Sequence, residues 1–186
     1  MFGNLLNNAL IKNLLEQKVL SITPYVSKDL QVAQYPLRVH AFAEVTAEKD
    51  ATPWVTLTDR QPVFHMKQRT YYWVEVAEMI VLPVGIVGRF VPASSLIEKG
   101  LGLTAGKIEN PFGSKGERIR FGLYNHLSTP VSWDRTERIA YIQFMDLRGM
   151  DNHKYTQNRI DREVYRFRLS READDGVNYE VDTDDE

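Results

Sequence analysis

The chain contains 186 residues, of which 43% are hydrophobic and 26% charged, and its formal net charge is −2. This composition is typical of a soluble globular protein with one sizeable core. Cysteine is absent, which excludes disulfides, thiolate metal sites and cysteine nucleophiles. No apolar run approaches the roughly 20 residues that cross a bilayer, and no secretory signal is recognisable, so we expect a cytoplasmic protein.

The charge is unevenly distributed along the chain. Residues 172–186 contain eight acidic residues and no basic one, and we interpret them as an acidic C-terminal tail that follows a single domain spanning residues 1–171. Five arginines between positions 159 and 171 precede this tail. They indicate either a phosphate or partner site that the tail regulates, or a solvated strand or helix followed by a frayed end.

The first predicted element is an amphipathic helix over residues 4–20. Leu6, Leu10 and Leu14 recur every four residues and share one face, and Pro24 ends the pattern. The polar face carries few basic residues, so we expect this helix to pack on the protein body rather than on a membrane.

Beyond residue 29 the sequence consists of short β-rich segments separated by proline, glycine and aspartate. One short helix is predicted over residues 94–99. Many short strands with frequent turn signals indicate an antiparallel barrel or sandwich rather than a parallel α/β sheet. The predicted strands cover residues 31–45, 54–57, 63–66, 71–76, 86–91, 118–125, 129–133 and 138–146.

Three sequence blocks follow one another along the chain. The segment IKNLLEQKVLSITPY lies near the N-terminus, the centre (residues 74–112) reads VEVAEMIVLPVGIVGRFVPASSLIEKGLGLTAGKIENPF, and a later block reads RIRFGLYNHLSTPVSWDRTERIAYIQF. In their order and spacing these blocks resemble the N-terminal helix with its exit, the centre and the closing strands of the dCTP deaminase family of the dUTPase superfamily. The matching residues include Glu78, Leu82, Pro83, Gly88, Ser94, Ser95, Leu96, Gly100, Leu101, Thr104, Ile108, Asn125, Pro130, Arg138, Ile139, Phe144, Lys154 and Tyr155.

The resemblance implies a mainly β protein with a distorted antiparallel barrel. It also implies a homotrimer with nucleotide sites between subunits. The fold itself would need no cofactor, and Mg²⁺ would enter only with a bound nucleoside triphosphate.

The residues that would carry out deamination are mostly replaced. Attack of water on a cytosine ring needs a general base and donors for the developing charge. The family's glutamate base corresponds to Gly122, which cannot move a proton. Glu117 lies five residues upstream, and in a continuous strand it would face the other side. The aspartate of the family's sugar-binding turn corresponds to Glu109, so Glu109 and Glu117 are the weak substitutes.

The cations of the family's phosphate site are also replaced. The arginine that precedes the two serines corresponds to Ala93, and a second arginine corresponds to Glu98, with reversed charge. Lys99 is adjacent but about 100° further round the helix.

Some candidate nucleotide-binding residues remain. Ser94 and Ser95 could present hydroxyls to an anion, or could merely cap a helix. Lys107 follows the sugar-pocket turn that ends in Glu109, and Lys154 and Tyr155 resemble the family's C-terminal phosphate-covering pair. The alternative for the last two is an ordinary surface pair.

The sequence gives little support to a metal site or to another class of nucleotide enzyme. None of His40, His65, His126 and His153 forms a metal-ligand spacing, so no metal site is predicted, and a zinc deaminase would need cysteines. A dUTPase would need a glycine-rich C-terminal arm, and the acidic tail contains one glycine, Gly176.

We therefore predict a non-catalytic, dCTP deaminase-like trimeric barrel that acts as a structural, assembly or binding module, with a virion as one setting. The alternative is a divergent, active dCTP deaminase or dUTP diphosphatase that uses a relocated carboxylate. The expected partners are further copies of the chain, a protein in a larger assembly and a deoxynucleotide. We expect no membrane and no nucleic acid.

Overall fold

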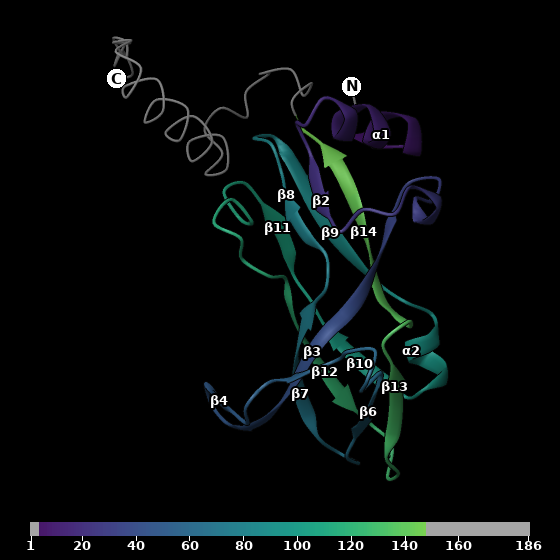
Figure 1. Ribbon diagram of the computed structural model, residues 1–186, viewed down its shortest axis with the longest axis vertical. Coiled ribbons are helices and arrows are strands. Elements are labelled where there is room, and N and C mark those ends of the chain that lie inside the picture. Colours follow the sequence, from purple (N-terminus) through teal and green to yellow (C-terminus); the bar gives the residue numbers. More distant parts are fainter. Residues whose placement is uncertain (1–3, 148–186) are drawn as a thin grey trace, which may run out of the picture. The chain divides into compact units, whose positions relative to one another are not determined.

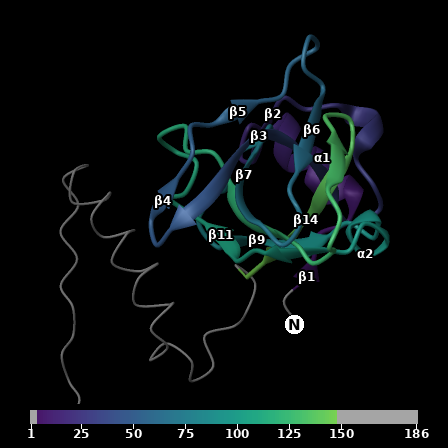
Figure 2. The same cartoon turned by 90° about the horizontal axis from the view of Figure 1, so that it is seen from below.

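Antiparallel strands dominate the computed structural model, which describes residues 4–147. The main sheet has the order β10-β12-β7-β3-β14-β9-β11, and three short strands pair with its members (Figure 1). Viewed from below, the strands curl around a common centre (Figure 2). The main strands are β3 (Tyr35–Ala47), β7 (Tyr71–Val76), β9 (Ile86–Pro92), β10 (Leu101–Thr104), β11 (Lys107–Glu109), β12 (Arg120–Asn125) and β14 (Arg138–Asp146).

Shorter elements surround this sheet. Strand β6 (Val63–Met66) pairs with β13 (Val131–Asp134), and β2 (Ser21–Thr23) pairs with β8 (Met79–Val81). The short strands attached to the main sheet are β1 (Asn4–Leu5), β4 (Asp50–Ala51) and β5 (Val55–Thr56). The helices are α1 (Asn8–Glu16), η1 (Ser27–Asp29) and α2 (Ser95–Glu98). No helix within residues 4–147 is long and apolar enough to cross a membrane.

Closure of the sheet follows from one short connection. Strands β10 and β11 lie at opposite ends of the strand order, yet only Ala105 and Gly106 separate them in the chain. Three peptide steps span at most about 11 Å, so the two edges of the sheet must approach each other. The predicted mainly β, barrel-like fold is confirmed.

The core follows the twofold alternation of the strands. On β7, Tyr72, Val74 and Val76 are fully buried, whereas Tyr71 and Trp73 are half-buried on the other face. The same alternation on β12 and β14 supplies the inward-facing aromatic and aliphatic side chains, because successive residues of a strand point to opposite faces. The largest buried side chains are Trp133, Tyr35, Tyr72, Phe42, Phe121 and Phe144.

The predicted elements agree with the structure except at boundaries and in the shortest strands. Strands β6, β7 and β14 have the predicted bounds, and α2 begins one residue later and ends one earlier than predicted. The prediction missed β1, β2, β4, β8, β10 and β11, each of two to four residues. Such segments contain too few residues to establish a period.

The N-terminal helix is shorter than predicted, and its buried face is shifted toward Ile11. It begins after Asn7, whose side-chain Oδ1 accepts a hydrogen bond of 3.0 Å from the Leu10 backbone N–H, and it ends before Lys18, which has a φ of 58°. Of the predicted leucines, Leu6 is buried and Leu14 packs against the core, but Leu10 is 47% exposed. Ile11, a flanking residue of the predicted face, is completely buried and takes the central place.

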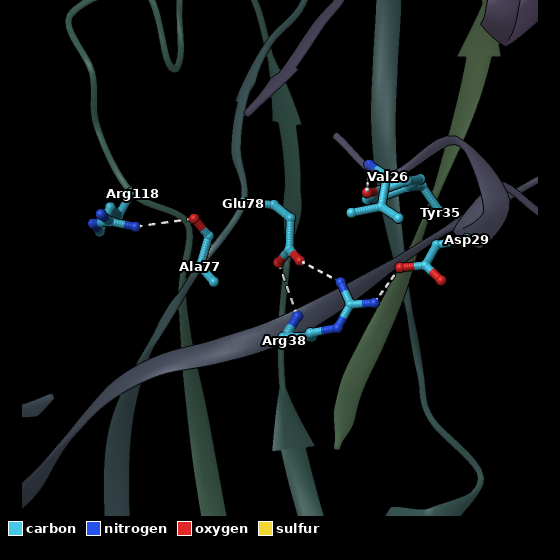
Figure 3. Close-up of polar contacts among 7 residues, drawn as sticks. All are labelled: Val26, Asp29, Tyr35, Arg38, Ala77, Glu78 and Arg118. Carbon is cyan, nitrogen blue, oxygen red and sulfur yellow. Dashed lines mark hydrogen bonds and ion pairs between the residues drawn. The ribbon is translucent and has the colours of Figure 1, made fainter. Parts of the chain in front are cut away.

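A buried carboxylate joins segments that are distant in the chain. Glu78 follows β7, is 1% exposed, and accepts hydrogen bonds from the backbone N–H and Nη1 of Arg38 at 2.8 and 3.0 Å (Figure 3). The second guanidinium nitrogen of Arg38 donates to Asp29 in η1. Strand β3, the β7–β8 turn and the N-terminal segment are thereby held together.

Further polar contacts support this junction. The Tyr35 hydroxyl accepts a hydrogen bond of 2.8 Å from the Val26 backbone N–H, and Arg118 Nη1 donates to the carbonyl oxygen of Ala77 at 3.1 Å (Figure 3). The same Nη1 donates to the Val76 carbonyl oxygen at 3.1 Å. Arg118 thus supplies donors to carbonyl groups where β7 ends, and Tyr35 supplies an acceptor to the N-terminal segment.

Burial raises the pKa of Glu78 above the ordinary carboxyl value, and this effect outweighs the donors of Arg38. A raised pKa in the folded state means that the folded protein binds the proton more tightly than the unfolded chain. The resulting contribution to stability is present at low pH and is lost as the pH rises through the folded-state pKa.

Replacing Glu78 with Gln removes this titration. Wild type should therefore gain stability relative to E78Q as the pH falls from about 8 to about 5, approaching the unfolded carboxyl pKa. Urea denaturation of both proteins across this range measures the difference. A difference in unfolding free energy that is independent of pH would contradict the prediction.

Candidate functional site

The position that corresponds to the family's base lies on the outward face of three neighbouring strands. Gly122 of β12 is paired with Trp73 of β7 and with Thr104 of β10 (Figure 1). By strand alternation, Tyr71 and Tyr124 belong to the same face. The face therefore consists of aromatic side chains around a glycine.

Tyr71 fills the space above Gly122. A Cβ atom added to Gly122 would lie 1.7 Å from the Tyr71 hydroxyl oxygen and 2.5 Å from its Cζ, far inside van der Waals contact. Gly122 is buried although it lies on the outward face. A glutamate side chain at this position would have to displace the tyrosine.

A second glycine repeats this arrangement on the edge strand. Gly102 of β10 is paired with Tyr124, and a Cβ atom at Gly102 would lie 2.4 Å from His126 Nε2. The rings of Tyr124 and His126 meet edge to face with centroids 4.8 Å apart. The Tyr71 ring thus covers Gly122, and the His126 ring covers Gly102.

The two predicted ligands on β11 contact each other. Lys107 Nζ lies 3.0 and 2.9 Å from the two carboxylate oxygens of Glu109, and both side chains are about half exposed. The short β10–β11 connection places them within a few residues of Thr104, the partner of Gly122. The structure therefore brings Lys107 and Glu109 near the base position, but as an ion pair.

Glu117 is not part of β12. It lies in the preceding loop, where its Oε2 accepts a hydrogen bond of 3.0 Å from the Lys115 backbone N–H. Backbone donors, first its own N–H and then that of Lys115, lower its pKa. This carboxylate accepts hydrogen bonds within a turn, and a lowered pKa makes it a weaker base at neutral pH.

The serines lie at the start of α2. Ser94 is exposed and Ser95 half-buried, and Ala93 before them is buried. Ser94 has helical angles (φ −60°, ψ −31°), and its side chain makes no capping hydrogen bond. The interpretation of Ser94 as an ordinary side-chain cap was therefore wrong.

Lys99 cannot serve as the missing phosphate cation in this geometry. Its Nζ lies 2.9 Å from a Glu137 carboxylate oxygen and donates to the Ser132 carbonyl at 2.9 Å, above the ring of Trp133. Glu98 is exposed on the same helix. The charge reversal at Glu98 is thus not compensated by its neighbour.

Two predicted ligands, Lys154 and Tyr155, lie outside the described residues, as do the basic stretch and the predicted boundary at residue 171. Within residues 4–147, no group of histidines and carboxylates could hold a metal ion. Sequence reasoning missed Tyr71, because only the register of β7 against β12 reveals that it covers Gly122.

Solved structures share this fold. The 2'-deoxycytidine 5'-triphosphate deaminase from Agrobacterium tumefaciens superposes with a TM-score of 0.63 at 16% identity, covering 78% of this chain and 47% of that one. The chain thus spans about half the length of that protein. Lower similarity is found to the dUTPase of phage phi11 of S. aureus (TM-score 0.47, 9% identity, 68% and 90% covered) and to EIAV dUTPase (0.42, 13%, 64% and 98%).

The fold is therefore shared with the dCTP deaminase structure. Residues 5–147 match the family model described as dCTP deaminase-like, and the chain belongs to this family. No curated protein matches it by sequence.

Replacing Gly122 with Ala should destabilise the protein by about 1–3 kcal/mol, because the new methyl group overlaps with the Tyr71 hydroxyl. In Y71A the hydroxyl is absent, so the same change should cost less, with a coupling energy of about 0.5–3 kcal/mol. Urea denaturation of the four proteins measures this coupling. Gly106, where an added Cβ would meet nothing within 4 Å, provides the control substitution G106A. Equal costs in both backgrounds would show that Tyr71 does not constrain Gly122.

Proposed function

We propose that this protein is a non-catalytic member of its family, which keeps the barrel as a structural, assembly or binding module. The observation that carries the proposal is the filling of the base position: Gly122 lacks an ionisable group, and Tyr71 occupies the volume in which one would begin.

The two candidate substitutes do not supply the missing base. The Glu109 carboxylate is paired with Lys107, and Glu117 accepts a backbone hydrogen bond in a turn outside β12. A general base must lie within hydrogen-bond reach of the water that it activates. Losing the base and the charge-stabilising groups removes about two to three decades of rate each.

Nucleotide contacts that survive would be few. They would involve Ser94, Ser95, Lys107, Lys154 and Tyr155, with Mg²⁺ present only as part of a bound triphosphate. Lys107 would first have to leave its carboxylate partner, and Glu98 adds repulsion at the start of α2. Binding should therefore be weak and would serve recognition rather than turnover.

The module would work as a homotrimer, by analogy with the family that the sequence resembles. A threefold particle offers three copies of each surface, and several weak contacts to a larger assembly then reinforce one another. A virion is one setting in which such a particle would serve. The structure described here concerns one subunit.

Purified protein should neither deaminate dCTP nor hydrolyse dUTP when Mg²⁺ is present. The variant G122E should also be inactive, because Tyr71 obstructs the new side chain and Ala93 and Glu98 leave the phosphates without cations. Release of ammonia and of pyrophosphate measures the two reactions, with an active dCTP deaminase as the positive control. Turnover of about 1 per second or faster would support a divergent deaminase or diphosphatase, and E109Q and E117Q would then identify its carboxylate.

Light scattering in dilute buffer should give a particle of about three times the 21.5 kDa mass of one chain. The reason is that closed symmetric assembly lets each subunit bury the same surfaces. A mass equal to that of one chain across the accessible concentration range would contradict the trimer.

A further inference from the structure

An arginine is held between two tryptophans on the outward face of the sheet. The Arg120 guanidinium carbon lies 5.0 Å from the ring centroid of Trp54 and 5.7 Å from that of Trp73. Its Nη2 also lies 2.9 Å from Glu75 Oε1, directly across the β7–β12 pair. We call these four residues the arginine–tryptophan surface.

These side chains are accessible and of the types that dominate binding. Trp54 is 36% exposed, and the Arg120 side chain is 52% exposed. Tryptophan and arginine are the residues most enriched among those that carry the energy of protein–protein interfaces. Two of the chain's three tryptophans meet here, which a solvated strand surface does not require.

The neighbouring side chains orient the Arg120 guanidinium but do not engage all of its hydrogen-bond donors. Arginine has five N–H donors, and among the described residues Glu75 is its one hydrogen-bond partner. The flanking indoles restrict the side chain, so a ligand would not have to order it. The remaining donors can form a forked pair of hydrogen bonds with a carboxylate.

We propose that the arginine–tryptophan surface binds an acidic segment of a partner protein, with an aspartate or glutamate carboxylate on Arg120 and neighbouring apolar side chains against Trp54. The proposal rests on the binding-module function and names the chemistry of its partner. Charge complementarity favours this occupant: the Arg120 guanidinium is positive and keeps donors beyond the one that contacts Glu75, and Glu75, 21% exposed, is already paired.

The same geometry disfavours single-stranded nucleic acid. Bases stack on free aromatic faces along a continuous basic groove. Here the guanidinium already covers one face of each indole, and the Glu75 carboxylate lies within the surface. Stacking on either of these faces would require Arg120 to leave first.

The test uses the full chain and an array of synthetic eight-residue peptides that combine aspartate and glutamate with leucine and phenylalanine. Each peptide is matched by a counterpart in which asparagine and glutamine replace the acids. Acidic peptides should bind wild type, and their amide counterparts should bind at least about tenfold more weakly. Binding should change the tryptophan fluorescence, because two of the three tryptophans form the surface.

The variants separate charge from geometry. R120A should weaken binding by about tenfold or more, and R120K should also weaken it, because lysine keeps the charge but lacks the planar fork. R135A is the matched control, since Arg135 is similarly exposed and is ion-paired with Asp59. It should leave binding unchanged, and melting curves should show that all variants fold.

Three results would overturn the proposal. They are no peptide binding at about 1 mM, equal weakening by R120A and R135A, or Arg120-dependent binding of a twenty-nucleotide thymidine oligomer in preference to every peptide. Enzymatic turnover of dCTP or dUTP would refute the non-catalytic function without affecting these measurements. The two proposals can therefore fail separately.

Discussion

The carboxylate of Glu78 imposes the constraint on which the arrangement of the barrel depends. A buried ionised group is costly unless charged and hydrogen-bonded partners surround it. Those partners come from Arg38, which in turn contacts Asp29, so three segments separated by up to 49 positions must meet at one point. Strand β3 is thereby set against the β7–β8 turn, and β7 carries the tyrosine that covers Gly122.

Closure of the sheet determines which residues can act together. The two-residue connection from β10 to β11 brings together the edges of a long sheet. Thr104, the cross-strand partner of Gly122, is therefore only three positions from Lys107 on β11. The fold thus joins the face around Gly122 to the strand that carries the Lys107–Glu109 ion pair.

Packing around two glycines shapes the outward face of the sheet. Gly122 and Gly102 lack side chains, and Tyr71 and His126 occupy the space in which their Cβ atoms would lie. Protein interiors tolerate few voids, so neighbouring rings fill the space that a glycine leaves. The face therefore carries aromatic and arginine side chains.

Local patterns determined much of this protein. The twofold alternation of β7 and the turns marked by proline and glycine predicted the β class and several strands. The ordered motifs predicted the family and assigned Gly122 to the position of the family's glutamate. Other features depended on contacts between distant residues. Lys107 is paired with Glu109, Glu117 lies outside its strand, and Tyr71 covers Gly122 only because β7 and β12 have one register. Strand register and side-chain pairing are set by the packing of the whole barrel, which no short stretch of sequence specifies.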